Sequence, residues 1–103
     1  LSRHLFDHQT VVIDCVTLWL TNFFYDNSND IDTSYHEAKT ELESISNQEA
    51  EFIIVSNEIG MGGHPENMLQ MKFADLQGRI NQYIAALSDE AFLMVSGLPI
   101  KIK

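Results

Sequence analysis

The stretch VSNEIGMGGHPEN, residues 55–67, joins an apolar run to a long helical pattern and decides how the chain is read. The run that leads into it, EFIIVSN at 51–57, has a continuous apolar centre, as in strands that are buried on both faces. Pro65 has the fixed backbone angle that suits the first turn of a helix. A buried strand, a glycine loop and a helix in that order predict an α/β fold.

Two other stretches repeat the shape of this strand. TVVIDC at 10–15 and EAFLMVSG at 90–97 are also apolar runs bounded by polar residues, and helical patterns separate all three runs. Strands that alternate with helices form parallel sheets covered by helices. We therefore expect one mostly parallel, three-layer sheet within a single domain that spans residues 1–103.

The helical patterns have clear apolar stripes. Ser34 and Glu37 form an S-x-x-E capping box, which predicts a helix start there. A second helix should begin at Pro65 and run for about 22 residues, long enough to cross a sheet. Gly78 inside it lowers helix propensity by about 1 kcal/mol, so we expect close packing or a nearby ligand to explain it. The stripe of the first helix comprises Tyr35, Ala38, Leu42 and Ile45; that of the second comprises Leu69, Phe73, Leu76, Ile80, Tyr83 and Leu87.

Composition excludes some classes of protein. The 103 residues include 15 acidic and 6 basic side chains, a formal net charge of −9, so they offer no basic surface for a nucleic acid. A nucleotide site needs only local donors and a metal and stays possible. The single cysteine, Cys15, falls in an apolar run, which predicts a buried, unreactive thiol and a cytoplasmic protein. No apolar run approaches the roughly 20 residues of a membrane span.

Asp14 ends the first apolar run, as the acid of a Walker B strand does. In an open parallel sheet ligands bind outside the carboxyl ends of the strands. A carboxylate there can hold Mg²⁺ through water while the metal bridges phosphate oxygens, and Thr17 can offer a hydroxyl to the same region. Asp14 could equally be the N-cap of the helix that follows. The spacing leaves both interpretations open.

Asn57 and Glu58 end the second apolar run and lead into a loop that contains Gly60 and Gly62. Glycines let backbone N–H groups approach an anion, and a following helix presents its positive end. The loop lacks the G-x-x-x-x-G-K-[ST] spacing of a Walker A motif. The glycines are therefore equally consistent with a connection that only permits tight turning.

Histidine placement gives little sign of a catalytic or metal site. Of the four histidines, His64 alone falls beside the predicted site, in the glycine loop. His36 should lie on the exposed side of its helix. His4 and His8 have helical ligand spacing, but no third ligand accompanies them.

Four segments together resemble one enzyme family. In this order and spacing, VVIDCVTLWLTN, VSNEIGMGGHPEN, FADLQGRINQYIA and VSGLPIKIK are similar to the bifunctional adenosylcobinamide kinase / adenosylcobinamide-phosphate guanylyltransferases of cobalamin biosynthesis. The resemblance covers about residues 10–103. It implies a RecA-like P-loop fold and a trimer. It also implies two reactions: phosphorylation of adenosylcobinamide by ATP or GTP with Mg²⁺, then transfer of GMP from GTP through a guanylylated histidine.

The resemblance also implies roles for particular residues. Asp14 matches the acid that ends the family's Walker B strand and would hold Mg²⁺ through water, and Thr17 matches the threonine near the nucleotide. Further matches are the active-site loop residues Asn57, Glu58, Gly60 and Gly62, and the polar helix positions Asp75, Arg79 and Asn81, which would face substrate or a trimer interface.

Some family features do not occur in these residues. The phosphate-binding loop and the guanylylated histidine of the family are expected upstream, so no histidine here is assigned that role. Met71 and Ala74 replace basic residues expected early in the long helix. We therefore expect the C-terminal part of the enzyme, inactive alone. The alternatives are a fragment of another P-loop kinase and a flavodoxin- or receiver-like interaction domain without chemistry of its own.

Overall fold

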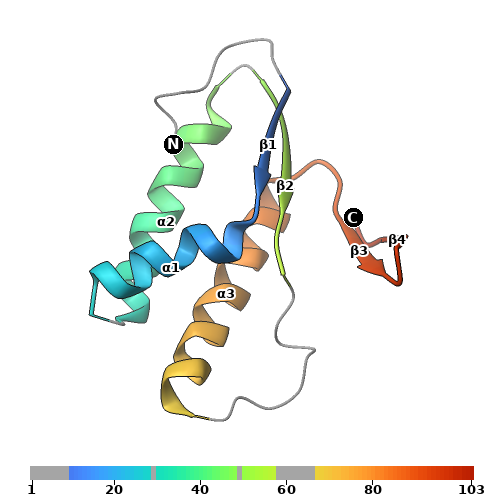
Figure 1. Ribbon diagram of the computed structural model, residues 1–103. Helices are drawn as coiled ribbons and strands as arrows, with labels where there is room; N and C mark the ends of the chain where they lie inside the picture. Colours follow the sequence, from blue (N-terminus) through green and yellow to red (C-terminus); the bar gives the residue numbers. More distant parts are fainter. Residues whose placement is uncertain (1–9, 29, 49, 58–66) are drawn as a thin grey trace.

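The computed structural model describes residues 10–28, 30–48, 50–57 and 67–103. Figure 1 shows the helices beside the parallel strands, with the hairpin set apart at the C-terminal end. The elements are β1 (Thr10–Asp14), α1 (Val16–Asp26), α2 (Ile31–Ser46), β2 (Glu51–Val55), α3 (Met68–Leu87), β3 (Phe92–Val95) and β4 (Leu98–Lys101).

β1 and β2 form the parallel pair that the apolar runs predict. Thr10 lies opposite Glu51 at one end and Asp14 lies opposite Val55 at the other. Both strands therefore end at the same edge of the pair. The residues that follow them, Cys15 and Ser56, both lie at this edge. This register confirms the predicted α/β class for the described part and defines the edge at which a ligand would be expected.

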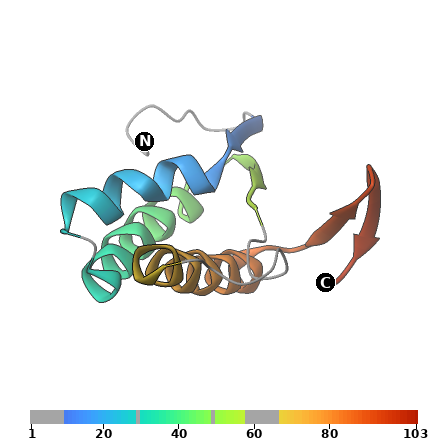
Figure 2. The same cartoon turned by 60° about the horizontal axis from the view of Figure 1, so that its bottom comes forward.

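All three helices pack on one face of this pair (Figures 1 and 2). The side chains of Ile13 and Ile54 face the helices, whereas Val12, Ile53 and Val55 on the opposite face are 59%, 48% and 43% exposed. The prediction that these strands are buried on both faces is therefore wrong for the described residues, which form two layers and not three. The core they share comprises Ile13, Val16, Leu20, Phe24, Ala38, Leu42, Ile45, Leu76, Ile80 and Ile84.

The third apolar run does not join the parallel sheet, contrary to the prediction. β3 pairs antiparallel with β4, with Val95 opposite Leu98. Ser96 and Gly97 both have positive φ, 52° and 77°, as a two-residue hairpin turn requires. The turn reverses the chain, so the two runs pair with each other. Figure 2 shows this hairpin standing away from the helices.

α2 starts earlier than the capping box predicts. The helix begins at Ile31 with Asp30 as its N-cap, so Ser34 lies inside it and is fully buried. Ser34 Oγ donates to the Asp30 carbonyl at 2.6 Å, while Thr33 Oγ1 donates to the Asp30 carboxylate at 2.5 Å. A serine inside a helix can bond back to the carbonyl four residues earlier, and that bond replaces the predicted cap. The predicted stripe of α2 is confirmed.

α3 starts three residues after the predicted proline. Asn67 is its N-cap and accepts a hydrogen bond from the Gln70 amide at 2.8 Å, whereas Pro65 lies outside the described residues. The middle of the predicted stripe is buried, but Leu69 and Leu87 at its ends are 42% and 44% exposed. None of the described helices is long and apolar enough to cross a membrane.

Candidate functional site

Asp14 stands at the carboxyl end of β1 with its side chain exposed. Cys15, and not Asp14, occupies the N-cap position of α1, with an extended backbone and no side-chain capping bond. The N-cap interpretation of Asp14 is therefore wrong. Its carboxylate is left available at the edge where a ligand of a parallel sheet would bind.

Cys15 is less buried than its apolar run predicts. The residue follows β1 and is half-buried at the start of α1. The Leu18 backbone amide hydrogen-bonds to the sulfur and lowers the pKa of the thiol below its ordinary value, as a helix N-terminus does for a thiolate. The prediction of a buried thiol is therefore wrong: the Cys15 thiol is partly accessible and lies beside Asp14.

Next to Asp14 the surface is hollowed. A shallow depression of about 360 Å³ runs along β1 and the first two turns of α1. Its lining combines apolar side chains with the polar groups of Asp14, Cys15 and Asn22; the apolar members are Val11, Val12, Ile13, Leu18 and Trp19. The depression gives a ligand room on the β1 side of the carboxyl edge.

On the β2 side, a network of polar side chains ties the strand end to α3. Gln77 Nε2 donates to Ser56 Oγ at 2.8 Å and to Asn81 Oδ1 at 3.0 Å, and Ser56 Oγ donates to the same Asn81 oxygen at 2.5 Å. Asn81 Nδ2 donates to the Asn57 carbonyl at 2.9 Å. Asn57 Nδ2 in turn approaches Cys15 Sγ at 3.9 Å. The ends of both strands and α3 therefore meet at one place.

The sequence places Ser56 at a strand end, but sequence reasoning did not predict the contacts of Ser56 and Gln77 in this network. Gln77 is fully buried, and the helical spacing 73, 77, 80, 84 puts it on the core face of α3. A polar residue within an apolar stripe was the signal that could have identified it. Gln77 Oε1 has no hydrogen-bond partner among the described residues, and an unpaired buried acceptor costs about 1–3 kcal/mol.

Thr17 lies in the first turn of α1, close to the same edge. Its Oγ1 is buried and makes no well-formed hydrogen bond to any described residue. The Thr17 side chain lies close enough to the Cys15 thiol to contribute to its lowered pKa, so this hydroxyl belongs to the start of α1, one turn after Asp14.

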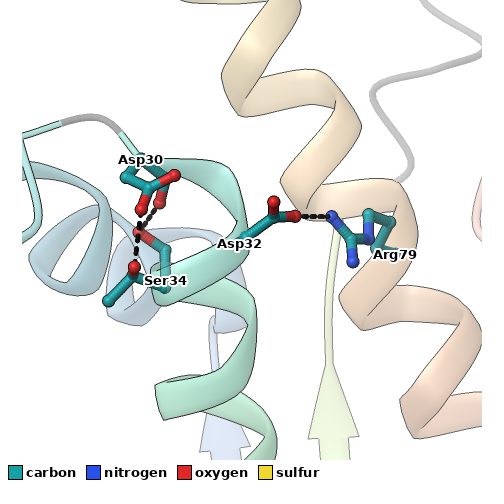
Figure 3. A network of polar contacts seen from close by, with 5 residues as sticks. Asp30, Asp32, Ser34 and Arg79 are labelled. Carbon is teal, nitrogen blue, oxygen red and sulfur yellow. Dashed lines mark hydrogen bonds and ion pairs between the residues drawn. The ribbon is translucent and has the colours of Figure 1, made fainter.

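Arg79 contacts residues of α2 and is not part of the polar network. Its Nη1 pairs with the Asp32 carboxylate at 3.1 Å (Figure 3), and its Cζ lies 4.3 Å from the centre of the Tyr35 ring. Asp75 is exposed and has no hydrogen bond or ion pair with another described residue. Of the three predicted helix residues, only Asn81 thus reaches the strand ends.

Several predicted positions lie outside the described residues, namely Glu58, Gly60, Gly62, His4, His8 and His64. His36 is exposed on α2, as expected. Within 10–28, 30–48, 50–57 and 67–103, no group of three or more His, Cys, Asp or Glu side chains could hold a metal ion. A metal at Asp14 would therefore need ligands other than such a cluster.

Comparison with known proteins settles the family. The family model described as cobinamide kinase / cobinamide phosphate guanyltransferase matches residues 1–102. The chain belongs to this family.

Three curated relatives are similar to this family member over most of its length. The bifunctional adenosylcobalamin biosynthesis protein CobU of Escherichia coli is 35% identical over 93% of the chain, and that of Salmonella typhimurium is 31% identical over all of it. The bifunctional adenosylcobalamin biosynthesis protein CobP of Pseudomonas aeruginosa is 34% identical over 90%. The chain spans 59%, 63% and 53% of the length of these relatives, respectively.

Proposed function

We propose that this chain forms part of an enzyme that phosphorylates adenosylcobinamide with ATP or GTP and then transfers GMP from GTP to the phosphate, giving adenosyl-GDP-cobinamide. The family match over residues 1–102 carries the proposal. The structure supports it through the shared carboxyl edge of β1 and β2, where Asp14 and Asn57 lie. That edge is where α/β sheets bind their ligands.

Asp14 and Thr17 would form the metal side of the site. Mg²⁺ keeps several waters and takes one or two carboxylates together with substrate phosphates, so the single exposed carboxylate of Asp14 suits it. Thr17, in the first turn of α1, would supply a hydroxyl near the same place once the site is completed by the rest of the enzyme. When bound, the metal would neutralise charge on the nucleotide phosphates, while Asp14 would orient its water shell.

The 103 residues contain no G-x-x-x-x-G-K-[ST] motif. The phosphate cradle and the guanylylated histidine would come from other residues of the intact enzyme, so this chain alone would not turn over nucleotide. The intact enzyme would be a trimer in the cytoplasm. The exposed outer face of the β1–β2 pair has apolar side chains that further protein could cover.

The direct test uses the intact protein that carries this chain. Incubation with adenosylcobinamide, GTP and Mg²⁺ should give adenosylcobinamide phosphate and then adenosyl-GDP-cobinamide, identified by mass. ATP in place of GTP should support only the first product. Absence of both products from a folded protein would contradict the proposed function.

A further inference from the structure

The polar network at the end of β2 fixes the direction of one amide. Asn81 Oδ1 accepts two hydrogen bonds, one from Ser56 Oγ and one from Gln77 Nε2. Since both donors lie on the oxygen side, Nδ2 must face away from them, and there it donates to the Asn57 carbonyl. The orientation of the Asn81 side chain is therefore determined by its neighbours.

Gln77 has its own orientation fixed in the same way. Its Nε2 donates hydrogen bonds to both Ser56 Oγ and Asn81 Oδ1. If the amide were flipped, Oε1 would face the Asn81 oxygen and neither bond could form. The orientation that serves the network leaves Oε1 buried and unpaired. An apolar side chain of similar shape would remove this unpaired oxygen, and Asn81 Oδ1 would keep its hydrogen bond from Ser56. What Gln77 adds is the direction of the Asn81 amide.

We propose that Asn81, held by Ser56 and Gln77, is a positioning residue that sets the backbone at Asn57, where the chain leaves β2 toward residues 58–66. This rests on the proposed function, in which the carboxyl edge of the sheet is the active edge. Asn81 would touch neither nucleotide nor corrinoid. It would act through the Asn57 carbonyl and thereby set where Asn57 itself stands at the edge shared with Asp14.

Asn81→Asp tests the proposal because it preserves shape and removes the donor. The carboxylate cannot donate to the Asn57 carbonyl and presents an oxygen to it. In the intact protein, kcat for both steps should fall about 10- to 100-fold, since small misplacements of reacting groups have effects of that size, while the KM for GTP stays within about twofold. Asn47→Asp is the matched control, because Asn47 is an exposed amide at the far end of α2.

Gln77→Met separates positioning from stability. This variant removes the unpaired oxygen together with both donated hydrogen bonds, and these effects on stability oppose each other. Its melting temperature should therefore stay close to that of the unmodified protein while kcat still falls. Ile45→Val is the matched stability control, because Ile45 is buried on α2 and is not part of the polar network. This variant should have a lower melting temperature. Its kcat should be unchanged at a temperature where all variants are folded.

Unchanged kcat in Asn81→Asp, or losses that follow the melting temperatures of all variants, would overturn the proposal. If the unmodified protein lacks both activities, the proposed function fails and the network is judged by amide hydrogen exchange at Asn57. Exchange at least about tenfold faster in Asn81→Asp than in Asn47→Asp would then uphold the positioning role, and equal exchange would refute it.

Discussion

The Arg79 guanidinium of α3 pairs with the Asp32 carboxylate of α2 at 3.1 Å while it lies over the Tyr35 ring. The pair is largely open to water, with the Asp32 side chain 81% exposed. Exposed ion pairs contribute about 0.2–1 kcal/mol, and an exposed cation–π contact adds about 0.5–1 kcal/mol. Arg79 therefore joins α3 to α2 within the described residues.

Substitutions at this contact should separate its two parts. Asp32→Asn should lower the free energy of unfolding by less than about 1 kcal/mol. Arg79→Ala should lower it more, because the stacking on Tyr35 and the packing of the side-chain stem are also lost. Chemical denaturation of both variants measures the difference. Loss of activity in a fully stable Arg79→Ala protein would instead indicate contact with substrate.

Gly78→Ala should stabilise α3. A Cβ at Gly78 would meet no atom within 4 Å, so close packing within the described residues does not explain this glycine. Alanine in a helix is more favourable than glycine by about 1 kcal/mol, and the melting temperature should rise accordingly. A lower melting temperature would contradict this. A stable variant that loses activity in the intact enzyme would show that a ligand or another segment needs the space.

Tyr83 should make the free energy of unfolding decrease at alkaline pH. Burial, and then the nearby Glu43 carboxylate, raise the pKa of the phenol above its ordinary value near 10.0. The folded protein therefore holds this proton more tightly than the unfolded chain. The stabilisation is complete below pH 10 and is lost as the pH rises through the folded-state pKa.

Denaturation at a series of pH values measures this effect. From pH 9 upward the free energy of unfolding should fall less steeply in Tyr83→Phe than in the unmodified chain. Tyr25→Phe, at a residue that is 65% exposed, should keep the original slope. Equal slopes in all three proteins would mean that Tyr83 does not hold its proton more tightly in the folded state.

Mg²⁺-GTP should leave the melting temperature of the 103-residue chain unchanged, because its sequence contains no G-x-x-x-x-G-K-[ST] motif. A site filled at 100 times its dissociation constant would stabilise the fold by about 2.7 kcal/mol, a shift of several degrees for a domain of this size. Calorimetry with and without Mg²⁺-GTP decides the matter. A clear upward shift would show that these residues form a complete nucleotide site.

Local patterns predicted the helices and the parallel pair well. The stripe of α2, the middle of the stripe of α3 and the apolar runs of β1 and β2 depend on residues near one another in the chain, and each lies within the element that was predicted for it. The third run was misplaced because an apolar stretch does not specify its partner. The Ser96–Gly97 turn that pairs it with β4 depends on positive φ at a serine, which sequence alone does not reveal.

The candidate site was predicted in part. Asp14 and Asn57 follow from the rule that strand ends meet at one edge, and Asn81 came from the family resemblance. The contacts of Ser56 and Gln77 could not be predicted from local patterns. The hydrogen bond from Gln77 to Ser56 spans 21 residues of sequence, and the one from Ser56 to Asn81 spans 25. The pairing of Arg79 with α2 spans 47 residues and was equally hidden from local patterns.

The most direct measurement is the kinase rate of the intact protein with Asp14→Asn. Asp26→Asn, an exposed acid at the end of α1, is the matched control. Because a catalytic metal stabilises the transition state by several kcal/mol, the variant should lose about 100-fold or more in kcat, while Asp26→Asn stays at the original rate. Equal rates in all three proteins would contradict the claim that the carboxyl edge of β1 and β2 is the active edge.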